Sequence, residues 1–532
     1  MKNHAAAPGS FSTIHTRYTE PAPAQRNPAP RNPPAERSVV RSDLSCESRL
    51  TALFFPLENF MELTSLPPSN SGASAGSDEP SEHPRAGALA SSMSVAFREE
   101  KLALRERSTK ALRPDELSRS VSGVEHRAAG AASRANVPII VHSHLRWDFV
   151  WQRPQQLLSR LVAHHPVLFV EEPADSASGP ALDVSLTPEG VVRVVPQLPN
   201  AGTLSVDAQC ALVLPLLARA LHEHPLLAGR FASPVQWFYS PMTAPGYVGR
   251  FNSTGTVYDC MDELAGFRFA PADIAERETF LLANADLVFT GGHELYRSKS
   301  ARHANTHFFG CGVDADHFAR ARARETVIPA ELDALARPIL GYFGVIDERL
   351  DYALIEQLAA RFPQASIAMV GPLAKVRRED LPSASNIHWL GSRSYESLPA
   401  AVKAFDICLM PFAMSAATQF INPTKTLEYL AAGKPVVSTA VPDVVRQYTD
   451  VVDVADSIES YVACVARLLV DVDPARTARG IAMARASSWN STVAAMRGHL
   501  LRTLARKRGD SDNVAPTADR SSMRFAQAAI GE

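Results

Sequence analysis

The chain has 532 residues, and its 54 Lys and Arg against 56 Asp and Glu give a formal net charge of −2. This balance excludes the overall basic character that is typical of nucleic-acid-binding proteins. The length exceeds what a single hydrophobic core organises and predicts two or three domains.

Six cysteines lie far apart without a CxxC pair, which favours reduced thiols over a disulfide framework or a zinc site. The sequence has no apolar run of the roughly 18–20 residues that a membrane-spanning helix needs. The N-terminus also lacks the layout of a signal peptide. We therefore expect a soluble, cytoplasmic protein.

Residues 1–134 are predicted to form a disordered extension. "PAPAQRNPAPRNPPAERS" is rich in proline and "PPSNSGASAGSDEPSEHPRAG" is small and polar, so neither buries enough apolar surface to offset its ordering entropy. One apolar island, "LTALFFPLENFMEL", interrupts them, and a start of translation near Met93 is an alternative for this region. We assign no function to it.

Order is predicted to begin at "VPIIVHSHLRWDFVWQRPQQLLSRLVAHHPVLFVEEP". Val137–Val141 is a predicted strand, Pro154 suits the first turn of a helix, and Val167–Val170 is a second strand. Further strands are expected at "VQWFYS", "GTVYDC", "ADLVFTG" and "THFFG", with an acidic helix beginning near Pro271. This alternation predicts a doubly wound parallel sheet over residues 135–325.

A turn-rich segment, "GCGVDADHFARARARETVIPAELDALARP", is predicted to connect two domains. A second alternation follows it, with strands in "ILGYFGV", "SIAMVG", "IHWLG", "DICLMPF" and "PVVST" and helices in "YALIEQLAARF" and "SLPAAVKAF". We expect a second domain over 326–485, a terminal helix over 486–508 that crosses back to the first domain, and a disordered tail over 509–532. The predicted fold class is α/β, with two Rossmann-like domains facing each other across a cleft.

The long loop "PFAMSAATQFINPTK" marks the expected ligand site, because ligands of open α/β sheets bind beyond the carboxyl ends of the strands. It leads into a helix predicted over Pro423–Ala432, with Asn422 as a capping residue. The free N–H groups of Thr424 and Lys425 and the positive end of the helix dipole attract an anion. A lysine in this turn costs the helix about 0.3–1 kcal/mol unless an anion is present. The pattern therefore favours a phosphate site.

Glu428 follows Lys425 by three positions, so both side chains share one helical face. One interpretation is a solvated ion pair on an exposed helix. The other starts from the apolar neighbours Leu427 and Tyr429–Ala432, which indicate a buried helix whose carboxylate needs a hydrogen-bonding partner. A ribose diol is such a partner.

The loop "HSHLRWDFVWQRP" is a candidate carbohydrate-type site at the carboxyl end of a strand. Its aromatic faces suit the C–H surfaces of sugars, and its charges suit hydroxyls or phosphate. Trp147, Arg146 and Arg153 are the candidate acceptor residues, and Asp148 is a candidate catalytic carboxylate. The alternative is that Arg153 and Trp151 only pack against the sheet edge.

His142 and His144 have the spacing of a metal pair, but no third ligand accompanies them. We expect ordinary hydrogen-bonding histidines and no metal site. In "YDCMDEL", Asp259 and Asp262 are further candidate catalytic carboxylates, to orient the acceptor hydroxyl or serve as base. Capping of the next helix is the alternative for both.

The terminal segment 493–508 is predicted to be a helix with one apolar face and many basic residues. The apolar face comprises Val493, Met496, Leu500 and Leu504. Burial against the first domain is the expected arrangement. The alternative is contact with anionic lipid, where a lipid-linked acceptor is found.

Together, "GCGVD", "GYFGVID", "DICLMPF" and "NPTKTLEYLAAGKPVVST" resemble the second half of glycosyltransferase family 4 enzymes of the GT-B fold. "SHLRWDFVWQRPQQLLSRL", "VYDCMDELAGF" and "ADLVFTGGHELY" are similar to a bacterial subgroup that includes teichuronic-acid and exopolysaccharide glycosyltransferases. The resemblance spans Val137 to Arg508. It implies sugar transfer from a UDP- or GDP-linked donor, with retention and with no obligatory metal or other cofactor.

The resemblance also implies roles for particular residues at the donor site, to which Asn422 belongs as well. Glu428 would hold the ribose hydroxyls, and Thr424 and Lys425 would meet the diphosphate or the donor sugar. Gly344 would let the chain approach the donor. Arg349 is the chosen diphosphate cation, because its planar fork suits phosphate oxygens.

Two positions depart from the family pattern. Phe420 stands where the first glutamate of the family's pair is expected, and Val345 stands where the family has an arginine. The expected function is transfer of a hexosyl-type sugar to a glycan or lipid-linked acceptor in envelope or exopolysaccharide synthesis, at the inner face of the cell membrane. A GT-B-fold nucleotide-sugar epimerase and a catalytically degenerate scaffold subunit are the alternatives.

Overall fold

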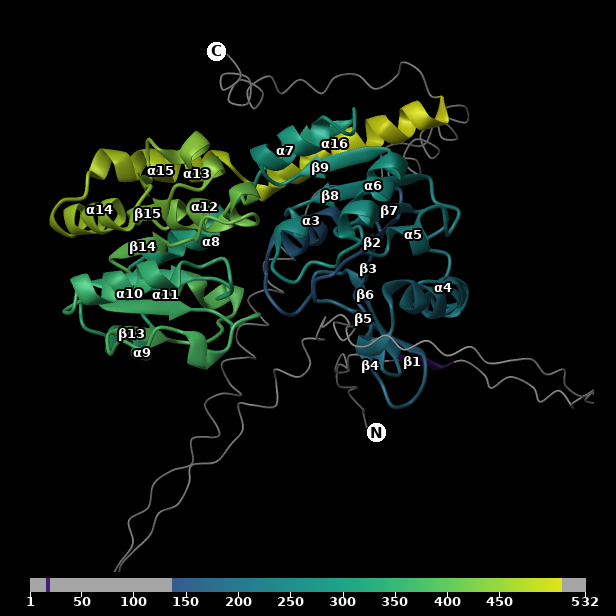
Figure 1. Cartoon of the computed structure of the whole chain (residues 1–532). Helices are drawn as coiled ribbons and strands as arrows, with labels where there is room; N and C mark the ends of the chain where they lie inside the picture. The colour runs from purple at the N-terminus through teal and green to yellow at the C-terminus, as the bar shows by residue number, and fades with distance from the viewer. Residues whose placement is uncertain (1–15, 20–135, 510–532) are drawn as a thin grey trace, which may run out of the picture. The chain divides into compact units, whose positions relative to one another are not determined.

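The computed structural model describes residues 136–509 together with the backbone of a short strand at Thr16–Thr19. The described residues form two α/β domains, each built on its own sheet (Figure 1). The predictions for the rest of the N-terminal extension, including the apolar island and Met93, and for the tail beyond Gly509 lie outside the described residues.

The first sheet has the strand order β1-β5-β6-β3-β2-β7-β8-β9-β10, and β4 pairs with β6. The path from β6 to β10 is parallel throughout, with the order that defines a Rossmann fold. Its strands are β2 (Ile139–His142), β3 (Val167–Val170), β4 (Ala174–Asp175), β5 (Ala181–Leu186), β6 (Val192–Leu198), β7 (Val235–Phe238), β8 (Gly255–Cys260), β9 (Leu287–Thr290) and β10 (Thr306–Phe308). Its helices are α3 (Arg153–Leu161), α4 (Val206–Glu223), α5 (Ala244–Tyr247), α6 (Ile274–Asn284) and α7 (His293–Ser300).

The antiparallel edge of this sheet was not predicted. β5 pairs antiparallel with β6, and β1 (Thr16–Thr19) pairs antiparallel with β5. The segment Thr16–Thr19 belongs to the extension that was expected to be disordered. It is rich in residues that favour strands, and β5 would otherwise leave its edge unpaired.

The second sheet is parallel, in the order β13-β12-β11-β14-β15-β16. Its strands are β11 (Ile339–Phe343), β12 (Ser366–Val370), β13 (Ile387–Trp389), β14 (Ile407–Met410), β15 (Val436–Thr439) and β16 (Asp453–Ala455). Its helices are α8 (Ala315–Ala319), α9 (Ala330–Asp333), α10 (Tyr352–Arg361), α11 (Leu398–Ala404), α12 (Thr424–Ala431), α13 (Pro442–Tyr448), α14 (Ile458–Val470) and α15 (Pro474–Ala486). The core of this domain already includes Val313, Phe318 and Ala321. The second domain therefore begins before the expected boundary at 325.

The terminal helix α16 (Trp489–Arg508) returns to the first domain, as the sequence predicted, and packs against α3 (Figure 1). The predicted apolar face of α16 is buried in the first domain's core, together with Trp489. At the basic end, Lys507 pairs with Asp286 at 2.7 Å. Within 136–509 no helix combines the length and hydropathy needed to cross a bilayer.

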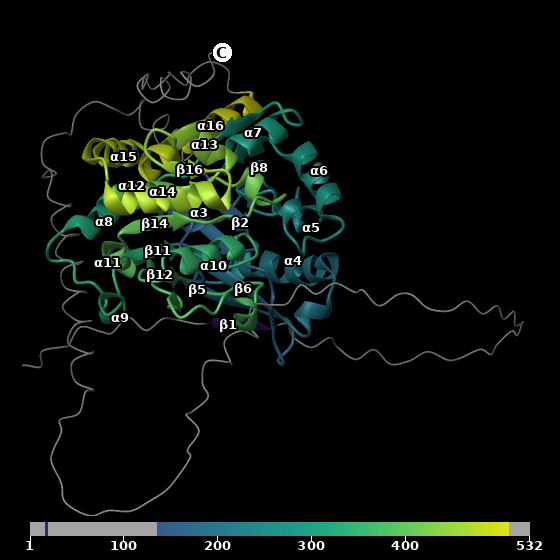
Figure 2. The same ribbon diagram turned by 60° about the vertical axis from the view of Figure 1, so that its left-hand side comes forward.

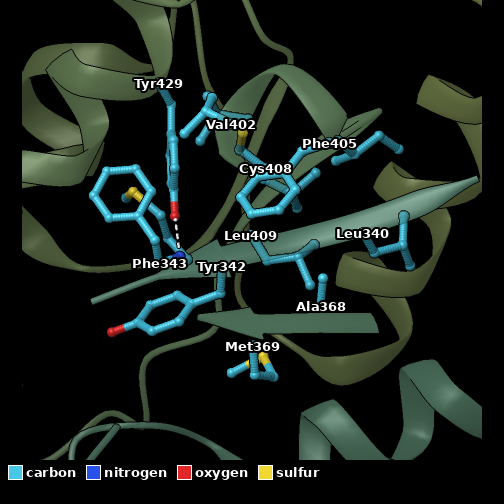
Figure 3. Close-up of a cluster of buried hydrophobic side chains, with 14 of the residues drawn as sticks. Leu340, Tyr342, Phe343, Ala368, Met369, Val402, Phe405, Cys408, Leu409 and Tyr429 are labelled. Carbon is cyan, nitrogen blue, oxygen red and sulfur yellow. Dashed lines mark hydrogen bonds between the residues drawn. The ribbon is translucent and has the colours of Figure 1, made fainter. Parts of the chain in front are cut away.

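Helix α12 is held by its buried face against the second sheet, and it lies beside β14 and α15 in both views (Figures 1 and 2). The hydroxyl of Tyr429 accepts a hydrogen bond from the backbone N–H of Phe343, at the end of β11, at 3.0 Å (Figure 3). This contact fixes the rotation of α12 about its axis. Lys425, four positions before Tyr429, lies on the same side of the helix, and its ammonium is near Gly344, just past the end of β11.

Gly341, in the middle of β11, leaves the space that the Phe405 ring occupies. A Cβ atom at this position would lie 2.1 Å from Cγ of Phe405. We expect Gly341→Ala to lower the free energy of unfolding by about 1–3 kcal/mol, because the core has no room for the added methyl group. Urea denaturation measures the change.

Gly498→Ala on α16 is the matched control. The new Cβ there meets only the far end of the Arg502 side chain, at 3.2 Å. Alanine favours a helix by about 1 kcal/mol over glycine, so this variant should be at least as stable as the parent. Equal stability of the Gly341→Ala protein and the parent would contradict the packing described for β11.

Candidate functional site

A cavity of about 400 Å³ lies where the strand ends of the two domains meet. Its lining contains ten of the twelve site residues predicted from the sequence, which are Trp147, Asp148, Arg153, Asp262, Gly344, Arg349, Asn422, Thr424, Lys425 and Glu428. Arg146 and Asp259 are not part of the lining. The sequence therefore located one common site from residues on both domains.

The amino-terminal end of α12 lines this cavity with Pro423, Thr424 and Lys425. The helix begins after Pro423, which is the N-cap residue and makes no side-chain cap. The prediction that Asn422 caps α12 is wrong. Its side-chain amide donates instead to the carboxylate of Asp443, at 3.0 Å, because that buried carboxylate needs a donor.

Glu428 is buried and Lys425 is half-buried where α12 lines the cavity, so the interpretation as a solvated pair on an exposed helix is wrong. Glu428 is 7% exposed, and the Lys425 ammonium lies 5.4 Å from the centre of the Tyr342 ring. Burial raises the pKa of Glu428 and lowers that of Lys425, and each charge partly offsets the effect on the other. No salt bridge closer than 4 Å joins the two within the described part of the chain. Both groups are therefore positioned to take a ligand as partner.

Gly344 has a role that differs from the expected one. Its φ is +137°, and a Cβ atom there would lie 2.1 Å from Cε and 2.5 Å from Nζ of Lys425. The absent side chain makes room for the lysine, in a backbone conformation that L residues rarely adopt. A residue with a side chain at this position would displace the ammonium group from the cavity.

The lowered pKa of Lys425 predicts how anion binding depends on pH. The lysine loses its positive charge at a lower pH than the usual value of about 10.4, so affinity for a nucleoside diphosphate should fall as the pH rises from neutrality toward that value. Calorimetric titration of UDP or GDP across this range measures the trend. The dependence should be absent in Lys425→Met, whereas an affinity that is constant with pH in the parent would contradict the assignment.

Arg349 lines the cavity, but its charge is already matched. Its Nε and Nη2 atoms donate to the Asp347 carboxylate at 3.0 and 2.7 Å. Burial opposes the charge of Arg349, yet the carboxylate raises its pKa further above the usual range. The guanidinium also lies 5.7 Å from the centre of the Phe267 ring. Lys425 is therefore the less neutralised cation at this end of the cavity.

Arg153 and Asp259 form a buried ion pair. Their side chains are 2% and 0% exposed, and Nη2 of Arg153 donates to Oδ1 of Asp259 at 2.9 Å. A further bond runs from Nη1 of Arg153 to the carbonyl of Phe309 at 2.8 Å. Asp259 does not line the cavity, so the proposal that it is a catalytic carboxylate is corrected to a role in holding Arg153. It does not cap α6 either, because that helix begins at Ile274 with Asp273 as its N-cap residue.

Asp262 is one of the carboxylates that the first domain presents to the cavity. Burial raises its pKa, and the positive charge of Arg349 in the second domain opposes this rise. The neighbouring Glu263 turns away and pairs with the buried ammonium of Lys299 at 2.7 Å. The Glu263–Lys299 pair therefore anchors the loop that carries Asp262.

Of the residues predicted in the loop after β2, some line the cavity and others do not. Trp147 is buried in the core but reaches the cavity wall, and its backbone N–H donates to Glu171 at 3.0 Å. Asp148 is exposed and pairs with Arg193. Nη1 of Arg146 donates to the Glu171 carboxylate at 3.2 Å and to the carbonyl of Glu172 at 2.6 Å. Arg146 therefore stabilises the loop and does not line the cavity.

His142 and His144 were expected to form ordinary hydrogen bonds, and the described part of the chain does not show them. His142 is stacked between Phe238 and Tyr247, with ring centres 4.7 and 4.6 Å away, and its ring nitrogens have no partner among the described residues. Burial lowers its pKa to about 3. Burial, and secondarily the charge of Lys375, lower that of His144 to about 4. The described residues contain no cluster of three or more metal-ligating side chains.

Three parts of the cavity lining were not predicted. Pro188 and Glu189 come from the turn between β5 and β6, and Arg393 and Tyr395 come from the loop after β13. Cys311 belongs to "GCGVD", and its thiol donates to the carbonyl of Asn422 at 3.1 Å. The alternation of apolar and polar residues in "ALDVSL" and "VRVVPQL" was the signal for the β5–β6 hairpin.

Phe420, which stands where the family has a glutamate, is not part of the cavity lining. Its side chain packs against the core of the first domain. Nearby, Asp443 of the second domain accepts a hydrogen bond from the backbone N–H of His293, the first residue of α7, at 2.9 Å. Apolar and polar contacts therefore join the two domains beside the amino-terminal end of α12.

Two Rossmann-like domains whose strand ends meet at one cavity define the GT-B fold of glycosyltransferases. Residues 337–471 match the family model "Glycosyl transferases group 1". The chain is 28% identical, over 203 residues, to TuaH of Bacillus subtilis (strain 168), which carries the provisional name teichuronic acid biosynthesis glycosyltransferase. This match covers 35% of the chain, and it spans half the length of TuaH.

Solved structures with the same fold include sucrose-phosphate synthase from Thermosynechococcus elongatus, with a TM-score of 0.52 and 17% identity. The comparison covers 70% of this chain and 100% of the synthase. The UDP-forming α,α-trehalose-phosphate synthase from Burkholderia xenovorans, in complex with glucose-6-phosphate, gives a TM-score of 0.50 at 14% identity, over 69% and 100% of the two chains. At these identities the likeness establishes the fold.

Proposed function

We propose that the protein is a glycosyltransferase that moves a hexosyl-type sugar from a UDP- or GDP-linked donor to a glycan or lipid-linked acceptor. The matched glycosyl transferases group 1 domain, the similarity to TuaH and the GT-B fold support this proposal. The transfer would belong to envelope or exopolysaccharide synthesis on the cytoplasmic side of the cell membrane, and the teichuronic acid biosynthesis in the name of TuaH supports the first part of this proposal.

One observation carries the proposal: the amino-terminal end of α12 opens into the cavity between the domains, and Lys425 and Glu428 both line that cavity. The free N–H groups and the ammonium suit a diphosphate. The Glu428 carboxylate, one turn further along, suits the two hydroxyls of a ribose. These groups match the two ends of one nucleoside diphosphate.

The chemistry follows from the two walls of the cavity. The acceptor hydroxyl forms a bond to the anomeric carbon while the bond from that carbon to the diphosphate breaks. Lys425 and the α12 N–H groups stabilise the charge that develops on the leaving diphosphate. Asp262 orients the acceptor hydroxyl, whose proton passes to the leaving phosphate oxygen, so the reaction proceeds with retention and without a metal.

Release of UDP or GDP from a panel of UDP-, GDP- and ADP-linked sugars, with and without saccharide acceptors, tests the proposal. We expect nucleotide release that depends on the acceptor. Interconversion of the donor sugar without an acceptor, observed by NMR, would identify an epimerase instead. Failure of the protein to bind any nucleotide in calorimetry would favour the scaffold alternative and overturn the proposal.

A further inference from the structure

The cavity extends beyond the donor site, which occupies only the part next to α12. Arg153, the first residue of α3, lines it at the carboxyl ends of the strands. Glu189 lines it from the turn before β6, where Gly190 faces Val162, the residue that follows α3. Since α3 has nine residues, these two ends lie roughly 13 Å apart along the helix. Glu189 therefore lies at the opposite end of α3 from Arg153.

Aromatic rings from both domains form one wall of this second end. Trp151 of the first domain lies against Tyr395 of the second, with ring centres 6.0 Å apart. Tyr395 is supported on its other side by His317, 4.5 Å away and nearly parallel. Trp147 meets Trp151 edge-on at 6.1 Å. A rigid wall of rings offers the apolar surface that matches the C–H face of a pyranose.

The buried polar atoms at this end that have no hydrogen-bond partner among the described residues include one acceptor and one donor. The acceptor is Oε2 of Glu189, and the donor is Nε of Arg393. Buried polar atoms in folded proteins have partners, so each of these requires one from outside the chain. A sugar hydroxyl both donates and accepts and can serve both.

The charges at this end favour a neutral hydroxylated ligand over a phosphate. Arg393 is paired with Glu331, and Asp148 is paired with Arg193. The carboxylates of Glu189 and Glu396 remain in the lining. A phosphate placed here would face two carboxylates, whereas hydroxyl groups can donate to them.

We propose that Glu189, Arg393 and the ring pair Trp151–Tyr395 form a subsite for a pyranose ring of the acceptor, so that the acceptor is a saccharide. The inference rests on the proposed function, since it names the class of molecule that receives the sugar. Glu189 accepts a hydrogen bond from a ring hydroxyl, and Trp151 packs against the ring. Neither residue contacts the donor.

The test is binding of neutral methyl glycosides of glucose, galactose and N-acetylglucosamine, measured by saturation-transfer NMR and tryptophan fluorescence in the presence of UDP or GDP. At least one glycoside should bind the parent protein. Glu189→Ala should weaken that binding about 10-fold or more, because a hydrogen bond to a charged group is lost. Glu189→Gln, which keeps the size and an acceptor oxygen, should lose less.

Glu356→Ala is the matched control, because Glu356 is exposed on α10 and outside the cavity lining. Its glycoside binding should equal that of the parent. Nucleotide affinity, measured in parallel, should be unchanged in all three variants. Equal glycoside affinity of Glu189→Ala and the parent, or absence of binding by every glycoside while the nucleotide binds, would overturn the subsite. Glycoside binding without nucleotide binding would support the subsite and contradict the proposed function.

Discussion

Arg153→Ala is expected to lower the free energy of unfolding by about 3–5 kcal/mol, the largest effect of any substitution considered for this protein. The change removes the partner of Asp259, whose side chain is fully buried, and leaves an uncompensated charge inside the first domain. It also removes the donor to the carbonyl of Phe309. Urea denaturation followed by circular dichroism measures the loss.

Arg377→Ala provides the matched control for Arg153. Arg377 pairs with Asp380 at 2.8 Å, but their side chains are 69% and 51% exposed. Solvent screens an exposed pair, which contributes little to stability, so this variant should unfold close to the parent. A loss of similar size in both variants would mean that burial does not determine the contribution of Arg153. The double variant Arg153→Met, Asp259→Leu should recover most of the stability, since it removes both charges together.

Lys425→Ala is expected to weaken the binding of UDP or GDP about 10- to 100-fold. A hydrogen bond to a charged group contributes about 1.5–3 kcal/mol, and Lys425 is the cation at the α12 end that no carboxylate matches directly. Loss of the lysine also raises the pKa of Glu428 further, so that this carboxyl group binds a proton and loses affinity for the ribose as a carboxylate. Calorimetry measures the affinity.

Glu428→Ala should weaken nucleotide binding as well, and the two substitutions together should cost less than the sum of their separate effects because the groups interact. Lys507→Ala serves as the control, since Lys507 lies on α16, outside the cavity lining, and its ammonium pairs with Asp286. Its affinity for nucleotide should equal that of the parent. Unchanged affinity in both Lys425→Ala and Glu428→Ala would remove the site assignment. Circular dichroism confirms that each variant is folded.

The sequence predicted most of the parallel strands of both domains, though not β6 or β16, because the predicted strands are short apolar runs between clear turn signals. β3 and β8 begin and end at the predicted residues, and α12 differs from its prediction by one residue at each end. The antiparallel hairpin β5–β6 was missed because alternating strands leave a weaker pattern than fully buried ones. Pro215 inside α4 likewise obscured a helix of 18 residues.

The site was predicted by topology more than by chemistry. Strand ends of parallel sheets meet at one edge, so residues that follow those strands were expected together, and ten of the twelve line one cavity. The sequence could not predict which of these charged side chains are already paired within the protein. Arg153 and Asp259 are 106 residues apart in the sequence, and the spacing of nearby residues cannot indicate a contact between such distant positions.

The contact between Asp443 and α7 couples the two lobes mechanically. A carboxylate of one lobe serves as the cap for a helix of the other, at 2.9 Å from the N–H of His293. If the lobes swing apart, that helix end loses its cap, at a cost of about 0.5–2 kcal/mol. Hydrogen exchange at the first turn of α7 therefore reports hinge opening, at a position remote from the chemistry.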